Sequence, residues 1–77
     1  MDDEDREVRL EAAALLFESA ADELDLAGAH ARRAAEHYRA GDVPRATAHA
    51  WAAFGHVRTG EERLATQAQE HRQRSLL

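Results

Sequence analysis

The first half of the chain carries a regular alternation of apolar residues three and four positions apart. All nine positions of this alternation are apolar: Leu10, Ala13, Phe17, Ala20, Leu24, Ala27, Ala31, Ala34 and Tyr38. This spacing places residues on one face of an α-helix and does not fit the period-two alternation of a strand. The pattern predicts one long helix over residues 4–40, with this row as its contact surface.

The alternation stops at the segment Ala40-Gly41-Asp42-Val43-Pro44, which carries three turn signals. Gly41 can adopt the left-handed conformation that closes a helix. Asp42 can cap the following helix with its carboxylate. Pro44 fits the first turn of that helix, where its missing N–H loses no hydrogen bond. The segment therefore predicts a helix, a tight turn and a second helix.

After the turn, the same spacing returns at Val43, Ala46, Ala50, Ala53, Val57, Gly60 and Leu64. This row predicts a second helix over residues 43–72, packed antiparallel to the first. We therefore expect an all-α fold, a long antiparallel helical hairpin that forms a single domain over residues 1–77 and is frayed at 1–4 and 74–77. Gly28 lies inside the first row and weakens a helix by about 1 kcal/mol relative to Ala. Three helices with a break near Gly28 are the alternative.

Several large apolar side chains lie outside these rows, and the clearest are Leu15, Trp51 and Phe54. An exposed Trp beside a Phe is the kind of patch that marks an interface on a small protein. Two hairpins packed face to face would bury such residues in a four-helix bundle, and twofold dimers are the commonest closed assembly. We therefore expect a homodimer with these three residues at its interface. The alternative is that Trp51 folds back over its own hairpin.

Charge is divided unevenly along the chain. Residues 1–25 carry ten acids and two Arg, a net charge of −8, and residues 26–77 carry five acids and eight Arg, a net charge of +3, which together give −5. The helix macrodipole favours acids at a helix N-terminus, which accounts for the first cluster without a ligand; an acidic patch for a basic partner is the alternative. Glu23 and Arg63 fall at matching positions beside the two rows, where they could pair. No basic stripe with interleaved aromatics appears, so we expect no nucleic-acid partner.

Four of the five histidines form two pairs with the same spacing. His30 and His37 are seven residues apart, as are His49 and His56. All four flank the apolar rows on the same side, so antiparallel packing should bring them to one edge of the hairpin. Imidazole suits Zn, Cu, Fe and Ni, which makes a metal- or small-ligand-binding bundle the alternative function. Seven residues span about 10.5 Å, however, so ligands would have to come from both helices at matched heights, and we expect no metal and no cofactor here.

Enzymatic motifs are missing from the sequence. Neither H-E-x-x-H nor the Glu-x-x-His of di-iron bundles occurs, and the glycines form no phosphate-binding loop or dinucleotide fingerprint. The chain contains no Cys, which excludes disulfides and thiolate chemistry. No apolar run approaches the roughly 20 residues of a membrane span. These features predict a non-enzymatic, cytoplasmic protein that does not bind a membrane.

A group of small residues and one Tyr around the turn resembles the core of a single tetratricopeptide repeat: Ala34, Tyr38, Gly41, Asp42, Ala46, Ala50 and Ala53. The resemblance covers residues 34–53 and implies two helices packed through small side chains. The whole chain, acidic and without Lys, also resembles small helical-hairpin proteins of haloarchaea that form a domain of unknown function. This second resemblance implies an archaeal, halophilic protein and assigns no site residues.

These expectations converge on a helical scaffold. We expect a non-enzymatic oligomerising module that recognises protein, as a homodimer and with a further, unidentified protein partner left open. The histidine-lined edge carries the alternative, binding of a metal or small ligand.

Overall fold

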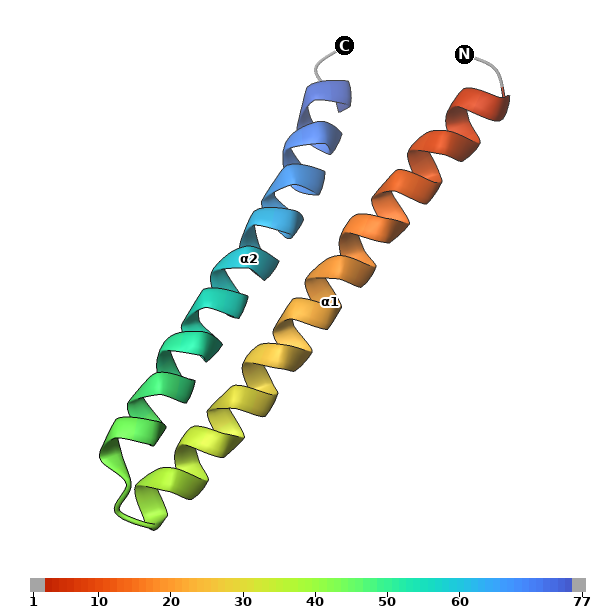
Figure 1. Cartoon of the computed structure of the whole chain (residues 1–77). Coiled ribbons are helices and arrows are strands. Elements are labelled where there is room, and N and C mark those ends of the chain that lie inside the picture. The colour runs from red at the N-terminus through yellow and green to blue at the C-terminus, as the bar shows by residue number, and fades with distance from the viewer. Residues whose placement is uncertain (1–2, 76–77) are drawn as a thin grey trace.

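Two helices make up the described chain. The computed structural model describes residues 3–75, and the side chains of residues 3–73. Helix α1 spans Asp3–Arg39 and helix α2 spans Val43–Ser75. They lie side by side and antiparallel, so the start of α1 and the end of α2 share one end of the molecule (Figure 1). The predicted all-α helical hairpin is confirmed.

The helix bounds differ in detail from those expected. α1 runs without a break through Gly28, so the three-helix alternative is wrong. α1 already includes Asp3, and α2 continues to Ser75 rather than ending near residue 72. Residues 1–2 and 76–77, which were also expected to fray, lie outside the described residues.

The turn forms as its sequence predicts. Gly41 has a positive φ of 78°. Its N–H donates to the carbonyl of Tyr38, and the N–H of Asp42 donates to the carbonyl of His37, at 3.0 and 2.8 Å. These two bonds are the Schellman closure of a helix. The N–H of Arg45 then donates to Oδ1 of Asp42 at 3.2 Å, which makes Asp42 the cap of α2.

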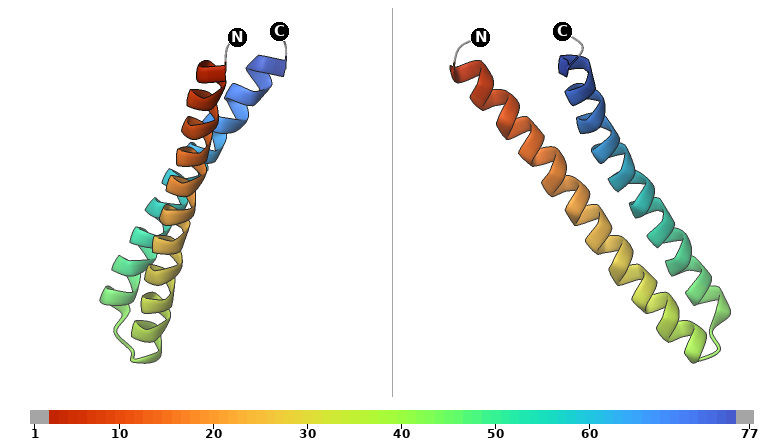
Figure 2. Two further views of the ribbon diagram at one scale, coloured as in Figure 1. Left: turned by 90° about the vertical axis from the view of Figure 1, so that its right-hand side faces the viewer. Right: turned by 180° about the vertical axis from the view of Figure 1, so that it is seen from behind.

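The hairpin is one layer thick and elongated. Its Cα atoms extend over 59 × 21 × 12 Å with a radius of gyration of 17.6 Å, whereas a compact domain of this length has a radius of about 11.5 Å. Seen edge-on, α2 passes from one side of α1 to the other at a shallow angle (Figure 2). No third element covers either face of the helix pair within residues 3–75.

Small side chains fill the seam between the helices. Ala20, Ala27, Ala34 and Ala46 are buried, and Gly60 is buried with them. None of the described large side chains is fully buried. Burying four methyl groups contributes only roughly 3 kcal/mol. The hairpin therefore has a narrow Ala/Gly seam and no large hydrophobic core of its own.

The second row at the seam is not the one expected. Four large residues expected in the contact surface of α1 are exposed: Leu10, Phe17, Leu24 and Tyr38. Val43, Val57 and Leu64 of α2 are exposed too, and so are two of the expected small residues, Ala31 and Ala50. One row of half-buried positions lies one residue earlier in the heptad and is mostly polar. We define this polar row as Glu23, His30 and His37 of α1 with His49, His56 and Arg63 of α2; Leu16 occupies the same heptad position nearer the start of α1 and is also half-buried.

The seam's own composition explains this rotation. Ala and Gly at its centre let the two backbones approach closely, which leaves little room for a Phe or Leu ring or branch between them. Members of the polar row also hydrogen-bond across the seam, as described below, and the apolar residues have no such cross-seam bonds to gain. The expected contact rows are thus half right: the buried Ala and Gly positions are correct, whereas the large residues, Ala31 and Ala50 lie at the exposed edge of the seam.

Candidate functional site

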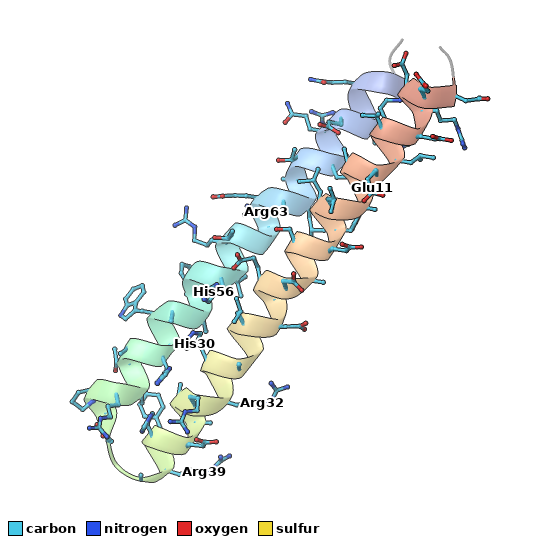
Figure 3. The ribbon with its side chains drawn as sticks, turned by 45° about the vertical axis from the view of Figure 1, so that its right-hand side comes forward. Glu11, His30, Arg32, Arg39, His56 and Arg63 are labelled. Atoms are coloured by element: carbon cyan, nitrogen blue, oxygen red, sulfur yellow. The ribbon has the colours of Figure 1, made fainter. Side chains whose placement is uncertain are left out.

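Four imidazole rings form a continuous stack along one edge of the seam, and we call this stack the histidine ladder. In order from the turn it contains His37, His49, His30 and His56, which alternate between α1 and α2. Neighbouring ring centroids are 5.3, 5.2 and 5.4 Å apart. The prediction that these four histidines meet on one edge of the hairpin is confirmed, and Figure 3 shows His30 and His56 there.

Register explains why the ladder forms. A spacing of seven residues returns each ring to the same side of its own helix, two turns further on. The turn sets α1 against α2 so that His30 lies between His49 and His56. His30 and His49 therefore each lie between two imidazoles of the other helix, and His37 and His56 end the ladder.

The centre of the ladder is a hydrogen bond between two imidazoles. Nδ1 of His30 lies 2.9 Å from Nδ1 of His49. Such a bond needs a proton on one of the two nitrogens and a lone pair on the other, so it cannot form when both rings are imidazolium. Desolvation between the helices, reinforced by the neighbouring His30 and His37, lowers the pKa of His49 below its usual value of 6.5.

Beyond the ladder, polar bonds continue along the same edge. Nδ1 of His56 contacts Oε2 of Glu23 at 2.6 Å. Nε of Arg63 donates to Oγ of Ser19 at 2.7 Å. Glu23 and Arg63, which were able to pair by their positions in the sequence, do not pair with each other, because each takes a different partner across the seam. These bonds fix the register of α2 on α1 over several turns.

The ladder offers few ligands for a metal. Among the described residues, no three His, Asp or Glu side chains lie close enough together to hold a metal ion. The rings stack face to face and tilted, so most of their nitrogens do not converge on one point. Only the His30 and His49 nitrogens face each other directly.

The other edge of the seam is apolar and open, and we call it the apolar face. It carries the outward row of each helix: Leu10, Phe17, Leu24 and Tyr38 of α1, and Val43, Val57 and Leu64 of α2. A shallow groove between the helices is lined by Phe17, Leu64 and Ala68 together with the polar residues Gln67 and His71, and Leu24 lies over Gly60. The apolar face lies opposite the ladder because the apolar and polar rows flank the central Ala row about 100° apart on each helix.

Trp51 and Phe54 extend the apolar face over the outer side of α2. Their rings meet edge to face, with centroids 6.2 Å apart. They remain 69% and 56% exposed, so Trp51 does not fold back under its own hairpin. Leu15 does not join them. It lies two residues from Phe17, which turns it roughly 160° around α1 to the side away from the apolar face.

Comparison with known proteins adds no relative. No protein-family model, no curated protein and no solved structure matches the chain. Within the described residues, neither helix is both long and apolar enough to cross a membrane.

The apolar face is what the sequence reasoning missed. The large apolar residues were expected inside the hairpin, and only Trp51, Phe54 and Leu15 were expected at an interface. One signal was available: the central row is almost purely Ala and Gly, and two helices that meet through such residues leave no space for larger ones. Histidines seven apart on both helices were the matching sign of a polar inner row.

Proposed function

We propose that this protein is a non-enzymatic oligomerising scaffold, in which two hairpins pair through their apolar faces to form a four-helix bundle. The observation that carries the proposal is the exposed apolar face itself. It runs along both helices, from Leu10 near the start of α1 to Leu64 on α2, and holds seven of the twelve exposed large apolar side chains among the described residues.

The surface area of the hairpin supports association with a second copy. The hairpin exposes 5973 Å². A compact monomer of 8.6 kDa exposes about 4,700 Å². The excess, about 1,300 Å², is larger than the roughly 800 Å² that each partner buries in a standard protein interface. A second hairpin laid on the apolar face would remove this excess and give each helix a second neighbour.

A pair of variants two residues apart tests the proposal. Phe17 and Leu15 are both 54% exposed on α1, Phe17 on the apolar face and Leu15 on the far side. Phe17→Ser forfeits roughly 1 kcal/mol of burial per copy, or about 2 kcal/mol per dimer, which raises the dissociation constant about thirtyfold. Leu15→Ser leaves the dimer unchanged.

Sedimentation equilibrium at micromolar concentration measures both variants and the native chain. The native chain should sediment as a dimer in low and in high salt, because the interface is apolar and salt screens only charge. A native chain that stays monomeric in both salts, or two variants that weaken association equally, would overturn the proposal.

A second candidate function is binding of a metal or small ligand at the histidine ladder. It is favoured by the two nitrogens of His30 and His49, which face each other across 2.9 Å. Because only these two converge, a metal would complete its coordination with water or a small ligand. Titration with Zn²⁺, Ni²⁺ and Cu²⁺ tests this function, with His30→Ala as the variant that abolishes binding and His71→Ala as the control outside the ladder. Equal uptake by native chain and His30→Ala would exclude the ladder as the site.

A further inference from the structure

The apolar rows have a symmetry that bears on how a second copy lies. The row of α1 is Leu10, Phe17, Leu24, Ala31 and Tyr38, and the row of α2 is Val43, Ala50, Val57, Leu64 and His71, each with a spacing of seven. Their midpoints are Leu24 and Val57. The hairpin sets these midpoints at nearly the same level, because Leu24 lies against Gly60, one turn from Val57.

A single twofold axis across the hairpin at this level can therefore serve both helices. Pairing about that axis places each residue opposite the residue of the second copy that lies equally far from the axis in the other direction. Leu24 then meets Leu24 of the second copy, and Val57 meets Val57. Elsewhere large side chains meet small ones: Phe17 lies opposite Ala31 of the second copy, and Leu64 opposite Ala50. Alternation of large and small residues at facing positions is how tightly packed helices interdigitate.

Charge on α1 follows the same symmetry. Beside the apolar row, on the side away from α2, runs a charged row with a spacing of seven: Glu4, Glu11, Glu18, Asp25, Arg32 and Arg39. All six are exposed, and Figure 3 shows Glu11, Arg32 and Arg39 along this side. The first four are acids and the last two are Arg. Two antiparallel copies of α1 therefore set Glu11 beside Arg39, and Glu18 beside Arg32.

The other twofold arrangement sets α1 on α2 of the second copy, with both turns at the same end. It brings large side chains together, because Phe17 would then face Leu64 and Leu24 would face Val57. On α2 the row that corresponds to the charged row is Pro44, Trp51, Arg58, Ala65 and Arg72. Glu11 would lie near Arg72 and Asp25 near Arg58, but Glu18 would face Ala65 and Arg32 would face Trp51, so Glu18 and Arg32 would lose their opposite charges. The alternation of large and small residues therefore favours the antiparallel pairing of like helices, and Glu18 with Arg32 distinguishes the two arrangements.

We propose that the second copy lies with its α1 antiparallel on α1 and its α2 antiparallel on α2, so that the two turns are at opposite ends of the bundle. This orientation rests on the proposed self-association. It brings Asp25 near its own symmetry mate, which is the one like-charge contact it creates in the charged row.

Single-cysteine variants test the orientation, because the native chain has no cysteine to interfere. Leu24→Cys should form a covalent dimer under mild oxidation, since the two thiols meet at the axis. Val57→Cys should do the same on α2 and keeps the test informative if Leu24→Cys folds poorly. Leu15→Cys, on the far side of α1, is the control and should stay uncrosslinked.

Charge exchange gives an independent measurement. Glu18→Arg should weaken the dimer several-fold in low salt. The double variant Glu18→Arg/Arg32→Glu should restore it, because exchanging both charges re-forms the ion pair, although each exposed pair contributes little by itself. Glu62→Arg, on the outer side of α2, is the matched control and should have a smaller effect.

The outcomes separate the orientation from the self-association. A native dimer that fails to crosslink through Leu24→Cys or Val57→Cys alone, but crosslinks when the two variants are mixed, has α1 on α2 of the second copy; this overturns the orientation and leaves the proposed function intact. A native chain that is monomeric by sedimentation overturns both. Covalent dimers of each single variant, with rescue by the charge exchange, establish the orientation.

Discussion

The closeness of the two helices at Gly60 can be measured by adding a side chain there. A Cβ on Gly60 would lie 3.3 Å from both Cγ and Cδ2 of Leu24 and 3.5 Å from the carbonyl oxygen of Ala20. Gly55, also within α2, has nothing within 4 Å of the same position. The same substitution can therefore be made in one helix with and without a neighbour across the seam.

Substitution of each glycine by alanine separates the effect of helix propensity from the effect of the contact across the seam. Ala is favoured over Gly in a helix interior by about 0.8–1.0 kcal/mol, so Gly55→Ala should raise the free energy of unfolding by about that amount. At Gly60 the new methyl group forces Leu24 to move by a few tenths of an ångström. Leu24 is 44% exposed and has room to move, so Gly60→Ala should gain only part of this, roughly 0–0.5 kcal/mol.

Valine enlarges the difference. Its helix propensity is within a few tenths of a kcal/mol of that of Gly, so Gly55→Val should be close to neutral. At Gly60 two further methyl groups meet Leu24 and the backbone of Ala20, and a backbone cannot step aside. Overpacking of this kind destabilises by about 1–3 kcal/mol, so Gly60→Val should be less stable than Gly55→Val by about that amount.

Urea unfolding followed by far-ultraviolet circular dichroism gives the four free energies, at one protein concentration for all variants. The reasoning depends on the difference between the two sites and not on either value alone. Equal stabilities for Gly60→Val and Gly55→Val would refute the close approach of α1 and α2 at Gly60.

Two further predictions concern the ladder and the turn. The folded state lowers the pKa of His49 below 6.5, so the unfolded chain binds more protons than the folded chain as the pH falls. The contribution of His49 to the free energy of unfolding is therefore present above about pH 6.5 and is lost as the pH falls below it. The urea midpoint should fall on acidification, and it should fall less in His49→Gln. Asp42 caps α2 through the N–H of Arg45, so Asp42→Ala should lower the free energy of unfolding by about 1 kcal/mol while Asp42→Asn retains most of it, and identical urea midpoints for the two variants would show that the cap contributes nothing.

The turn and the ladder could be read from the sequence because each rests on local or repeated signals. Gly41 and Asp42 specify a closure and a cap within three residues, and the structure has both. The histidines were predictable for a different reason. A spacing of seven on both helices fixes their side, and the turn fixes their height, so no knowledge of side-chain packing was needed.

The inner and outer rows were not predictable in the same way. On α1 the central row of Ala20, Ala27 and Ala34 is flanked by an apolar row on one side and a mostly polar row on the other. Either flanking row could complete the contact with α2. Hydrophobicity alone favours the apolar row. The choice is made by contacts across the seam, such as those of His30 and Glu23, and by the close backbone approach that alanine permits. Neither is visible in one helix considered alone.

The two edges of the seam differ in role: the polar row holds α2 on α1, and the apolar face remains largely exposed. Hydrogen bonds are directional, so the polar edge sets one register for α2 on α1, whereas Ala and Gly alone would tolerate sliding. On the apolar face Leu24 lies against Gly60, but most of the surface of its large side chains stays exposed. Had Phe17 and Leu24 closed the hairpin instead, the histidines would be solvated and the dimer proposed above would lose its driving force. A hairpin that holds itself together through imidazoles and small residues leaves its large apolar side chains exposed, so the weakness of its own core and the proposed association with a second copy have the same cause.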